Sequence, residues 1–270
     1  MTDTTQFPYE LLEEFGLTPS MIDDLPEHVI ETLYSGGRSP LLPIIVKTDG
    51  EDIKIHAKFR LISTNEENGK FGVVFYPKMS QAPIDNFTED EQKQLLAGHV
   101  IIADLLVGEK NASKTQCFVQ IDKDTNHVFY VPTPVIGRNL RGVDEIIELT
   151  PEHFTALKSG DVVYVDTPEP MSIGINLFTE TGVFVCSGDE ANWHRVVGKS
   201  LPKYNFGIDG CWVNDNGELN YVQEDDYTPE ILEEQRRLVE RYDYAIRNTD
   251  TNDLHEEHVE KHDANNQISR

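Results

Sequence analysis

Basic residues are scarce in this sequence. Only 23 lysines and arginines stand against 48 aspartates and glutamates, so the net charge is −25 at pH 7. Proteins that bind nucleic acid neutralise its phosphates with clustered lysine and arginine side chains. Anionic membrane surfaces attract the same side chains. We therefore expect neither direct nucleic-acid binding nor membrane binding. The acidic surplus either keeps the surface solvated or offers a negative face to a basic partner.

Long apolar runs and paired cysteines are also missing. No stretch reaches the roughly 18 apolar residues of a membrane-spanning helix. The N-terminal residues do not combine a basic region with an apolar one, so we expect no signal peptide. Cys117, Cys186 and Cys211 lie far apart in strand-like contexts, which favours reduced core thiols over a disulfide. These absences predict a cytoplasmic location.

A recurring segment organises what is present. The stretch FTEDEQKQLLAGHVI at 87–101 recurs 62 positions later as LTPEHFTALKSGDVV at 149–163. A fainter copy, LPEHVIETLYSGG, lies 62 positions earlier at 25–37. In register, each copy has a leucine three residues before a glycine: Leu33 and Gly36, Leu95 and Gly98, Leu157 and Gly160. We interpret the chain as one small unit used three times.

Local signals predict where the helices of these units begin and end. Thr88 and Glu91 form a capping box, and Thr150 is followed by Pro151, which suits the first helical position. A glycine after the last turn suits the left-handed residue that closes a helix. Strand-like stretches follow each helix, at 41–46, 53–62 and 71–77, at 100–107, 115–122 and 127–132, and at 162–166, 171–178 and 182–186.

These patterns predict an α+β fold. Apolar residues occupy every second position from Ile53 to Leu61, which is typical of an antiparallel strand buried on one face. We expect three tandem helix–strand–strand–strand units with antiparallel sheets, then a hairpin turning at Asn216–Gly217 and a C-terminal helix. The residues at 192–204, between the third unit and the hairpin, are irregular in pattern.

The same reading divides the chain into segments. They are an N-terminal domain at 1–80 with two short helices and unit one, unit two at 81–142, unit three at 143–200, the hairpin and C-terminal helix at 201–248, and a disordered acidic tail at 249–270.

Candidate binding residues are few. The motif GRNLRG at 137–142 places Arg138 and Arg141 between glycines, where guanidinium groups could receive a phosphate or a partner carboxylate. The alternative is a plain loop that connects units two and three. Trp193 and Trp212 could form a ligand shelf, but we favour core packing for both.

The C-terminal helix is the longest that the sequence predicts. It runs from Thr228, the cap, to Asn248, with Pro229 at its first position and apolar residues over more than one stripe. It either packs on the chain's own sheet or contacts a partner through an i, i+3, i+7 face. Tyr227, Tyr242 and Tyr244 would be anchors of that contact.

Three histidines near the C-terminus are weak candidates for metal ligands. His258 and His262 are four residues apart and would share a helix face, with His255 nearby. The segment has no apolar face, so a solvated tail is the alternative. No serine–histidine–aspartate set and no G-x-S-x-G motif can be picked out, so we expect no enzyme activity and no cofactor.

Two parts of the chain resemble a known family. Residues 7–78, with FPYELLEEFGL and DDLPEHVIETLYSGGRSPLLPI, resemble the N-terminal domain of an uncharacterised family carried by conjugative and mobilisable elements of Bacteroidetes. Residues 87–186 resemble its companion repeat domain. The most specific pattern is LP-x(6)-L-x-x-G-x-x-[ST]-P-L-L-P at 25–43. The resemblance covers about two-thirds of the chain. It implies a mobile-element accessory protein and carries over no catalytic residue.

Three hypotheses about function follow. The first is a non-enzymatic protein-interaction or accessory protein of a mobile genetic element, conjugative or phage, because the scaffold recurs without a reactive residue. His99 and Asp161, which follow the closing glycines, do not match. The second is an acidic DNA mimic that inhibits a basic, DNA-binding defence protein of the host. The third is a metal-dependent enzyme that uses the C-terminal histidines. The partner is expected to be a protein, and the oligomeric state stays open.

Overall fold

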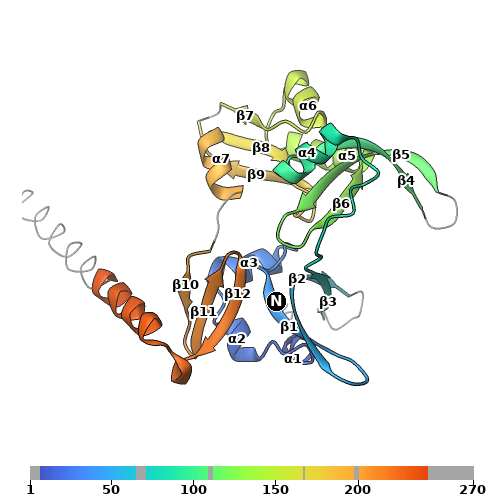
Figure 1. The fold of residues 1–270 in the computed structure, drawn as a ribbon. Coiled ribbons are helices and arrows are strands. Elements are labelled where there is room, and N and C mark those ends of the chain that lie inside the picture. The colour runs from blue at the N-terminus through green and yellow to red at the C-terminus, as the bar shows by residue number, and fades with distance from the viewer. Residues whose placement is uncertain (1–6, 65–70, 109–111, 167, 198–200, 243–270) are drawn as a thin grey trace, which may run out of the picture.

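The computed structural model describes residues 7–64, 71–108, 112–166, 168–197 and 201–242 (Figure 1). Its fold is α+β. The described residues form four three-stranded antiparallel sheets, and in each sheet the strands lie side by side in sequence order. The predicted order of helix followed by three strands is present in all three expected units.

The elements have the following bounds. The first unit contains α1 Tyr9–Glu13, α2 Pro19–Asp23, α3 Glu27–Tyr34, β1 Leu42–Lys47, β2 Asp52–Ser63 and β3 Phe71–Pro77. The second contains α4 Glu89–Ala97, β4 Ile101–Val107, β5 Ser113–Asp122, β6 His127–Pro132 and α5 Thr133–Asp144. The third contains α6 Pro151–Lys158, β7 Val163–Val165, β8 Met171–Ile175 and β9 Val183–Ser187. The last segment contains α7 Glu190–Val197, β10 Tyr204–Phe206, β11 Gly210–Asp215, β12 Glu218–Gln223, the 3₁₀ turn η1 Glu224–Asp226, and helical residues 229–242.

The helix ends form where the local signals predicted them. The Thr88 hydroxyl accepts from the backbone N–H of Glu91, whose carboxylate accepts in return from the Thr88 N–H at 2.8 Å. Gly98 and Gly160 are left-handed, with φ of 90° and 89°. The leucines that precede these glycines, Leu33, Leu95 and Leu157, are fully buried, each with an exposed fraction of 0%.

Two predicted stretches fold differently from expectation. The prediction that GRNLRG is a connecting loop is wrong, because it lies inside α5. Ile136 and Leu140 are buried on one face of this helix, whereas a side chain at Gly137 or Gly142 would meet nothing within 4 Å. A glycine in an exposed helix position costs only about 1 kcal/mol. The burial of one helix face therefore outweighs the turn signal.

The stretch at 192–204 was expected to be irregular, yet it contributes most of α7 and the start of β10. Trp193, 6% exposed, holds α7 against the third sheet, because its ring packs in a T-shape on Phe184 and lies over Gly174. Since β10 pairs with β11, the predicted hairpin is part of a three-stranded sheet. Its turn at Asn216–Gly217 is confirmed, and both residues have positive φ.

The four sheets form two bodies (Figure 1). The terminal body, residues 7–77 and 201–223, joins the two ends of the chain, because Trp212 and Leu219 of the last sheet pack in one core with the first unit. The indole N–H of Trp212 donates to the Met21 carbonyl at 2.9 Å, and the Leu219 N–H donates to the Leu41 carbonyl at 2.9 Å. The central body, residues 84–197, contains the second and third sheets, which share a core around α5 and Phe118.

Two expectations from the sequence concern the state of the cysteines and the presence of a membrane-spanning helix. Cys117, Cys186 and Cys211 all carry free thiols, and burial raises the pKa of each. Within the ranges that the structure describes, every helix is too short or too polar to cross a membrane.

Candidate functional site

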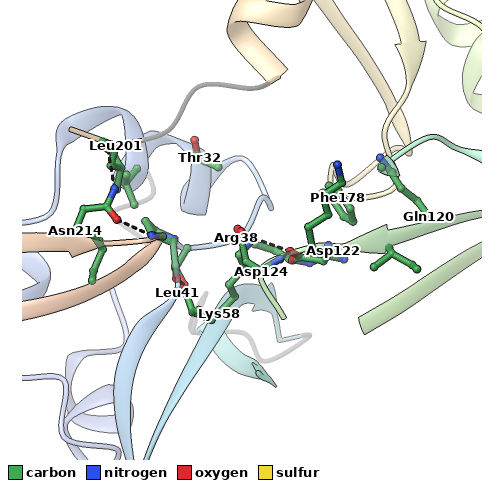
Figure 2. Close-up of a pocket in the computed structure, with 18 of the residues that line it drawn as sticks. Thr32, Arg38, Leu41, Lys58, Gln120, Asp122, Asp124, Phe178, Leu201 and Asn214 are labelled. Carbon is green, nitrogen blue, oxygen red and sulfur yellow. Dashed lines mark hydrogen bonds and ion pairs between the residues drawn. The ribbon is translucent and has the colours of Figure 1, made fainter. Parts of the chain in front are cut away.

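A cleft of about 620 Å³ lies between the two bodies (Figure 2). The terminal body lines it with residues of β2 and of the segment that leads into β1, and with residues of the last sheet. The central body lines it with the end of β5, the turn that follows, and Phe178 of the third unit. Figure 2 shows Arg38, Lys58, Asp122 and Asp124 close together at its centre. Three of the four sheets and a loop of the third unit contribute residues to the cleft.

Strand β2 carries a row of basic side chains, of which Lys58 lines the cleft. Successive residues of a strand point to opposite faces, so His56, Lys58 and Arg60 lie opposite the buried apolar face of β2. The Lys58 ammonium lies 2.9 Å from Asp122 Oδ1 and 2.6 Å from Asp124 Oδ2. The Asp122 side chain is only 4% exposed, so this ion pair is well shielded from water.

Glu218, the first residue of β12, connects the last sheet to the same basic face. Its carboxylate lies 2.6 Å from Lys78 Nζ and 3.5 Å from His56 Nδ1. The hydrogen bond from Lys78 lowers the pKa of the Glu218 carboxyl below its ordinary value, and the nearby His56 adds to this effect. The polar face of the first sheet is therefore an electrostatic contact surface for other parts of the chain.

Arg38 stands at the point where three units meet. Its guanidinium carbon lies 3.7 Å from the ring centroid of Phe129, 4.8 Å from that of Tyr76 and 5.1 Å from that of Phe178. These three rings come from the second, first and third units. Burial lowers the pKa of Arg38, but a guanidinium stays charged at neutral pH, so the contacts are cation–π interactions.

The cleft contains buried polar groups with and without hydrogen-bond partners. Its buried hydroxyl is already committed, because Ser39 Oγ accepts from the Phe59 N–H at 2.8 Å and donates to the Pro40 carbonyl at 2.7 Å. Arg38 Nε and Nη1 and Asp122 Oδ2 are buried and make no hydrogen bond to any described protein atom. Donors and an acceptor of this kind suit bridging water or a small polar group.

The two arginines predicted as an anion site are exposed on α5, and the structure does not bring them to the cleft. Arg141 lines a second cavity, of about 690 Å³, together with Lys158 of α6 and Asp144. Arg138 is not among the residues that line it. One of the two predicted arginines therefore shares a surface hollow with another cation and a carboxylate.

The two tryptophans are core residues. Trp212 has no exposed surface, and its ring packs on Tyr221 at a centroid distance of 5.1 Å. Trp193 belongs to α7 and is buried against Phe184 of β9. Neither indole presents a face to a ligand, which agrees with the packing role that we favoured.

The C-terminal helix presents the clearest contact surface. The Thr228 hydroxyl caps it by accepting from the Ile231 N–H at 3.4 Å, and Glu230 pairs with Lys203 at 2.7 Å, while Ile231 is buried. Beyond this first turn the helix extends away from both bodies (Figure 1). Its apolar side chains are then uncovered: Leu232 is 49% exposed, Val239 55% and Tyr242 70%.

The exposure of individual side chains bears on the two predicted roles of the helix. The chain's own sheet does not cover Leu232, Val239 or Tyr242, whereas Ile231 is buried and Leu238 is half-buried. An isolated helix of this length is marginal in water. Tyr242 lies on the uncovered face, as the sequence predicted for an anchor.

The predicted metal ligands His255, His258 and His262 lie outside the described residues. Within the ranges that are described, histidine, cysteine and acidic side chains do not gather in groups of three or more that could hold a metal ion.

Sequence reasoning missed the junction residues Arg38, Lys58 and Asp122. A signal for Lys58 was present, since the polar positions of β2 carry four basic residues, Lys54, His56, Lys58 and Arg60, in a strongly acidic chain. The partners on β5 and β6 are more than 60 residues away, and periodicity within a strand carries no information about them.

Comparison of the chain with known protein families, with curated proteins and with solved structures finds no match.

Proposed function

We propose that this protein is a non-enzymatic interaction protein that binds another protein through the apolar face of helical residues 229–242. The observation that carries this proposal is the exposure of Leu232, Val239 and Tyr242 along one face of a helix that leaves both bodies. Apolar residues at a helical spacing are the usual means by which a helix is recognised by a groove or by another helix.

The energetics favour a partner over permanent exposure. Full burial of a leucine- or valine-sized side chain contributes about 1.5–3 kcal/mol, and tyrosine is enriched among the residues that dominate interfaces. Leu232, Val239 and Tyr242 are each about half exposed or more, so part of that free energy is still available. The anchored first turn lowers the entropy that binding must remove, because the start of the helix is already held in place.

The cellular role that we propose is that of an accessory protein of a mobile genetic element, acting in the cytoplasm. The resemblance of residues 7–78 and 87–186 to the family of conjugative and mobilisable elements supports this role. The junction between the bodies supports a scaffold, because Lys58 pairs with Asp122 and Asp124 and the buried hydroxyl of Ser39 is engaged by the backbone.

The test compares two matched double variants of the tagged full chain in the cell that makes it. Leu232→Gln with Val239→Gln changes the apolar face, and Glu233→Gln with Arg237→Gln changes the opposite face of the same helix. We expect proteins that co-purify with the natural chain to be lost from the first variant and retained by the second. Retention of all of them by the first variant would overturn the proposal.

The same experiment addresses the DNA-mimic hypothesis. A basic DNA-binding protein that stays bound to both variants and is released by moderate salt would support mimicry, because salt screens contacts between surface charges. Mobile-element proteins that are lost only from the apolar-face variant would support the accessory role.

A further inference from the structure

The cavity of about 690 Å³ in the central body, which we call the α5–α6 cavity, is lined by three elements that each present one regular face to it. Its lining residues on α5 are three or four positions apart and so share one side of the helix: Pro134, Gly137, Arg141 and Asp144. The remaining lining residues are Thr133 at the start of α5, Gln116 and Phe118 of β5, and Phe154 and Lys158 of α6.

The walls of the α5–α6 cavity belong to a packed core. Ile136 and Leu140 of α5 have no exposed surface, and they lie in one apolar cluster with Phe118 of β5 and Leu157 of α6. The side of α5 that lines the cavity is next to this buried side, so the same packing holds the lining residues in place. The cavity is therefore present in the folded chain without a ligand.

The charged groups of the cavity favour an anion. Arg141 and Lys158 outnumber Asp144, whose carboxylate already accepts from the Leu149 N–H at 2.9 Å. Guanidinium and ammonium groups bind carboxylate or phosphate oxygens through charge-assisted hydrogen bonds. In a chain of net charge −25, this local excess of positive charge draws an anion to the cavity rather than to the surrounding acidic surface.

The aromatic side chains favour a flat apolar group joined to that anion. Phe118 is buried and Phe154 is half-buried, and Lys158 Nζ lies 5.9 Å from the centroid of the Phe154 ring. A planar ring that stacks on Phe154 therefore places its substituent within reach of the Lys158 ammonium. Ligand cavities of this size commonly combine apolar walls with a few polar groups that fix the orientation of the ligand.

Gly137 leaves the space that such a ring needs. A Cβ built at this glycine would meet nothing within 4 Å, although the residue lies inside a helix of 12 residues. Glycine destabilises a helix interior relative to alanine, and the packing around Gly137 does not exclude a side chain. Glycine of this kind suits a close approach of a ligand to the backbone. Gly142 has the same open surroundings outside the cavity and serves as a control.

From these features we propose that the α5–α6 cavity binds a small organic anion in which a planar ring carries a carboxylate or a phosphate. Arg141 and Lys158 hold the oxyanion, and the ring lies against Phe154 and over Gly137. The cavity contains no residue of the helix at 229–242, so this binding is independent of the proposed protein contact.

Ligand-observed NMR titration of the full chain with phenyl phosphate and with benzoate tests the inference. We expect binding with a dissociation constant of roughly a millimolar or less for at least one of them, and the tighter of the two identifies the oxyanion. Inorganic phosphate carries the anion alone and benzyl alcohol carries the ring alone, so both should bind at least about tenfold more weakly.

Two matched pairs of variants on α5 locate the site. Arg141→Gln removes a charged contact and should weaken binding at least about tenfold, whereas Arg138→Gln changes a cation outside the cavity and should leave binding unchanged. Gly137→Leu places a side chain in the cavity and should abolish binding, whereas Gly142→Leu places the same side chain outside it. Circular dichroism and urea midpoints should show that all four variants fold, because a side chain at either glycine meets open space and both arginines are exposed.

Three results would overturn the inference. The first is that neither aromatic anion binds at concentrations up to about 10 mM. The second is binding that survives Arg141→Gln or Gly137→Leu, or that is lost equally from the Arg138→Gln and Gly142→Leu controls. The third is inorganic phosphate that binds as tightly as phenyl phosphate, because this would show an ion at exposed cations and no site for a ring.

Discussion

Replacing Asp24 with alanine tests how the two ends of the chain are held together. Asp24 follows α2 and is 4% exposed. Its carboxylate accepts from the Ile208 N–H at 2.5 Å, from the Asp209 N–H at 3.1 Å and from the Tyr221 hydroxyl at 2.5 Å. All three donors belong to the last sheet or to the turn before β11, so one side chain connects segments more than 180 residues apart.

The expected loss of unfolding free energy follows from these three donors. A buried donor that loses its acceptor costs about 1–3 kcal/mol. Ile208 is 87% exposed, so water can reach this turn and the lower end of the range applies. We expect Asp24→Ala to lower the free energy of unfolding of the terminal body by about 3 kcal/mol. Asp24→Asn keeps one acceptor oxygen and should cost about half as much.

The assay uses the two tryptophans as separate reporters. Trp212 lies in the terminal body and Trp193 in the central body, so urea unfolding of a Trp193→Phe background follows Trp212 fluorescence alone. We expect the midpoint to fall with little change in the slope of the transition. A loss below about 1 kcal/mol for Asp24→Ala would refute the idea that this carboxylate holds the last sheet on α2.

Three further predictions concern other contacts. Thr88→Ala removes the cap of α4 and should lower the free energy of unfolding by about 1 kcal/mol in chemical denaturation, whereas Thr88→Ser should be close to neutral. Arg38→Lys keeps the charge but loses the planar face that stacks on Phe129, so it should lower the urea midpoint by the equivalent of about 1–2 kcal/mol; Arg138→Lys on the exposed face of α5 is the control and should have no effect. The hydrogen bond to Asp23 raises the pKa of Tyr9 to about 12, and burial raises the pKa of Cys211 to about 11. These pKa values are raised in the folded state, so their contribution to stability is complete below the ordinary pKa values near 9 and 10 and is lost as the pH rises through 11 and 12. Urea midpoints at about pH 8 and at about pH 11 will measure this loss of stability. Equal midpoints at the two pH values would contradict the prediction.

Short-range signals carried most of the secondary structure. The Thr88 capping box, the left-handed Gly98 and the alternation from Ile53 to Leu61 each depend on residues within one or two turns or within one strand. Such features are decided locally, so the sequence predicts them well. The error at α5 has the same origin, because Gly137 and Gly142 resemble turn residues until the burial of Ile136 is known.

The candidate contact surface was only partly predictable. The apolar spacing of the C-terminal helix indicated a buried face and named Tyr242 as an anchor, but it could not say whether the chain's own sheet covers that face. The sequence left a ligand shelf open for Trp212 beside the favoured core role, and the residue is core because the N-terminal helices pack on it. In both cases the answer depends on segments that are distant in sequence.

By itself, the sequence determined the α+β class, the helix caps, the strand faces and the acidic balance, because each of these follows from the identity and spacing of neighbouring residues. The tertiary structure decided which surfaces meet. It brought the last sheet onto the first unit through Asp24, paired the basic face of β2 with Asp122 and Glu218, and left Leu232, Val239 and Tyr242 exposed. These outcomes depend on contacts between residues far apart in the chain, and a local pattern shows that a side chain needs a partner without showing which one it finds.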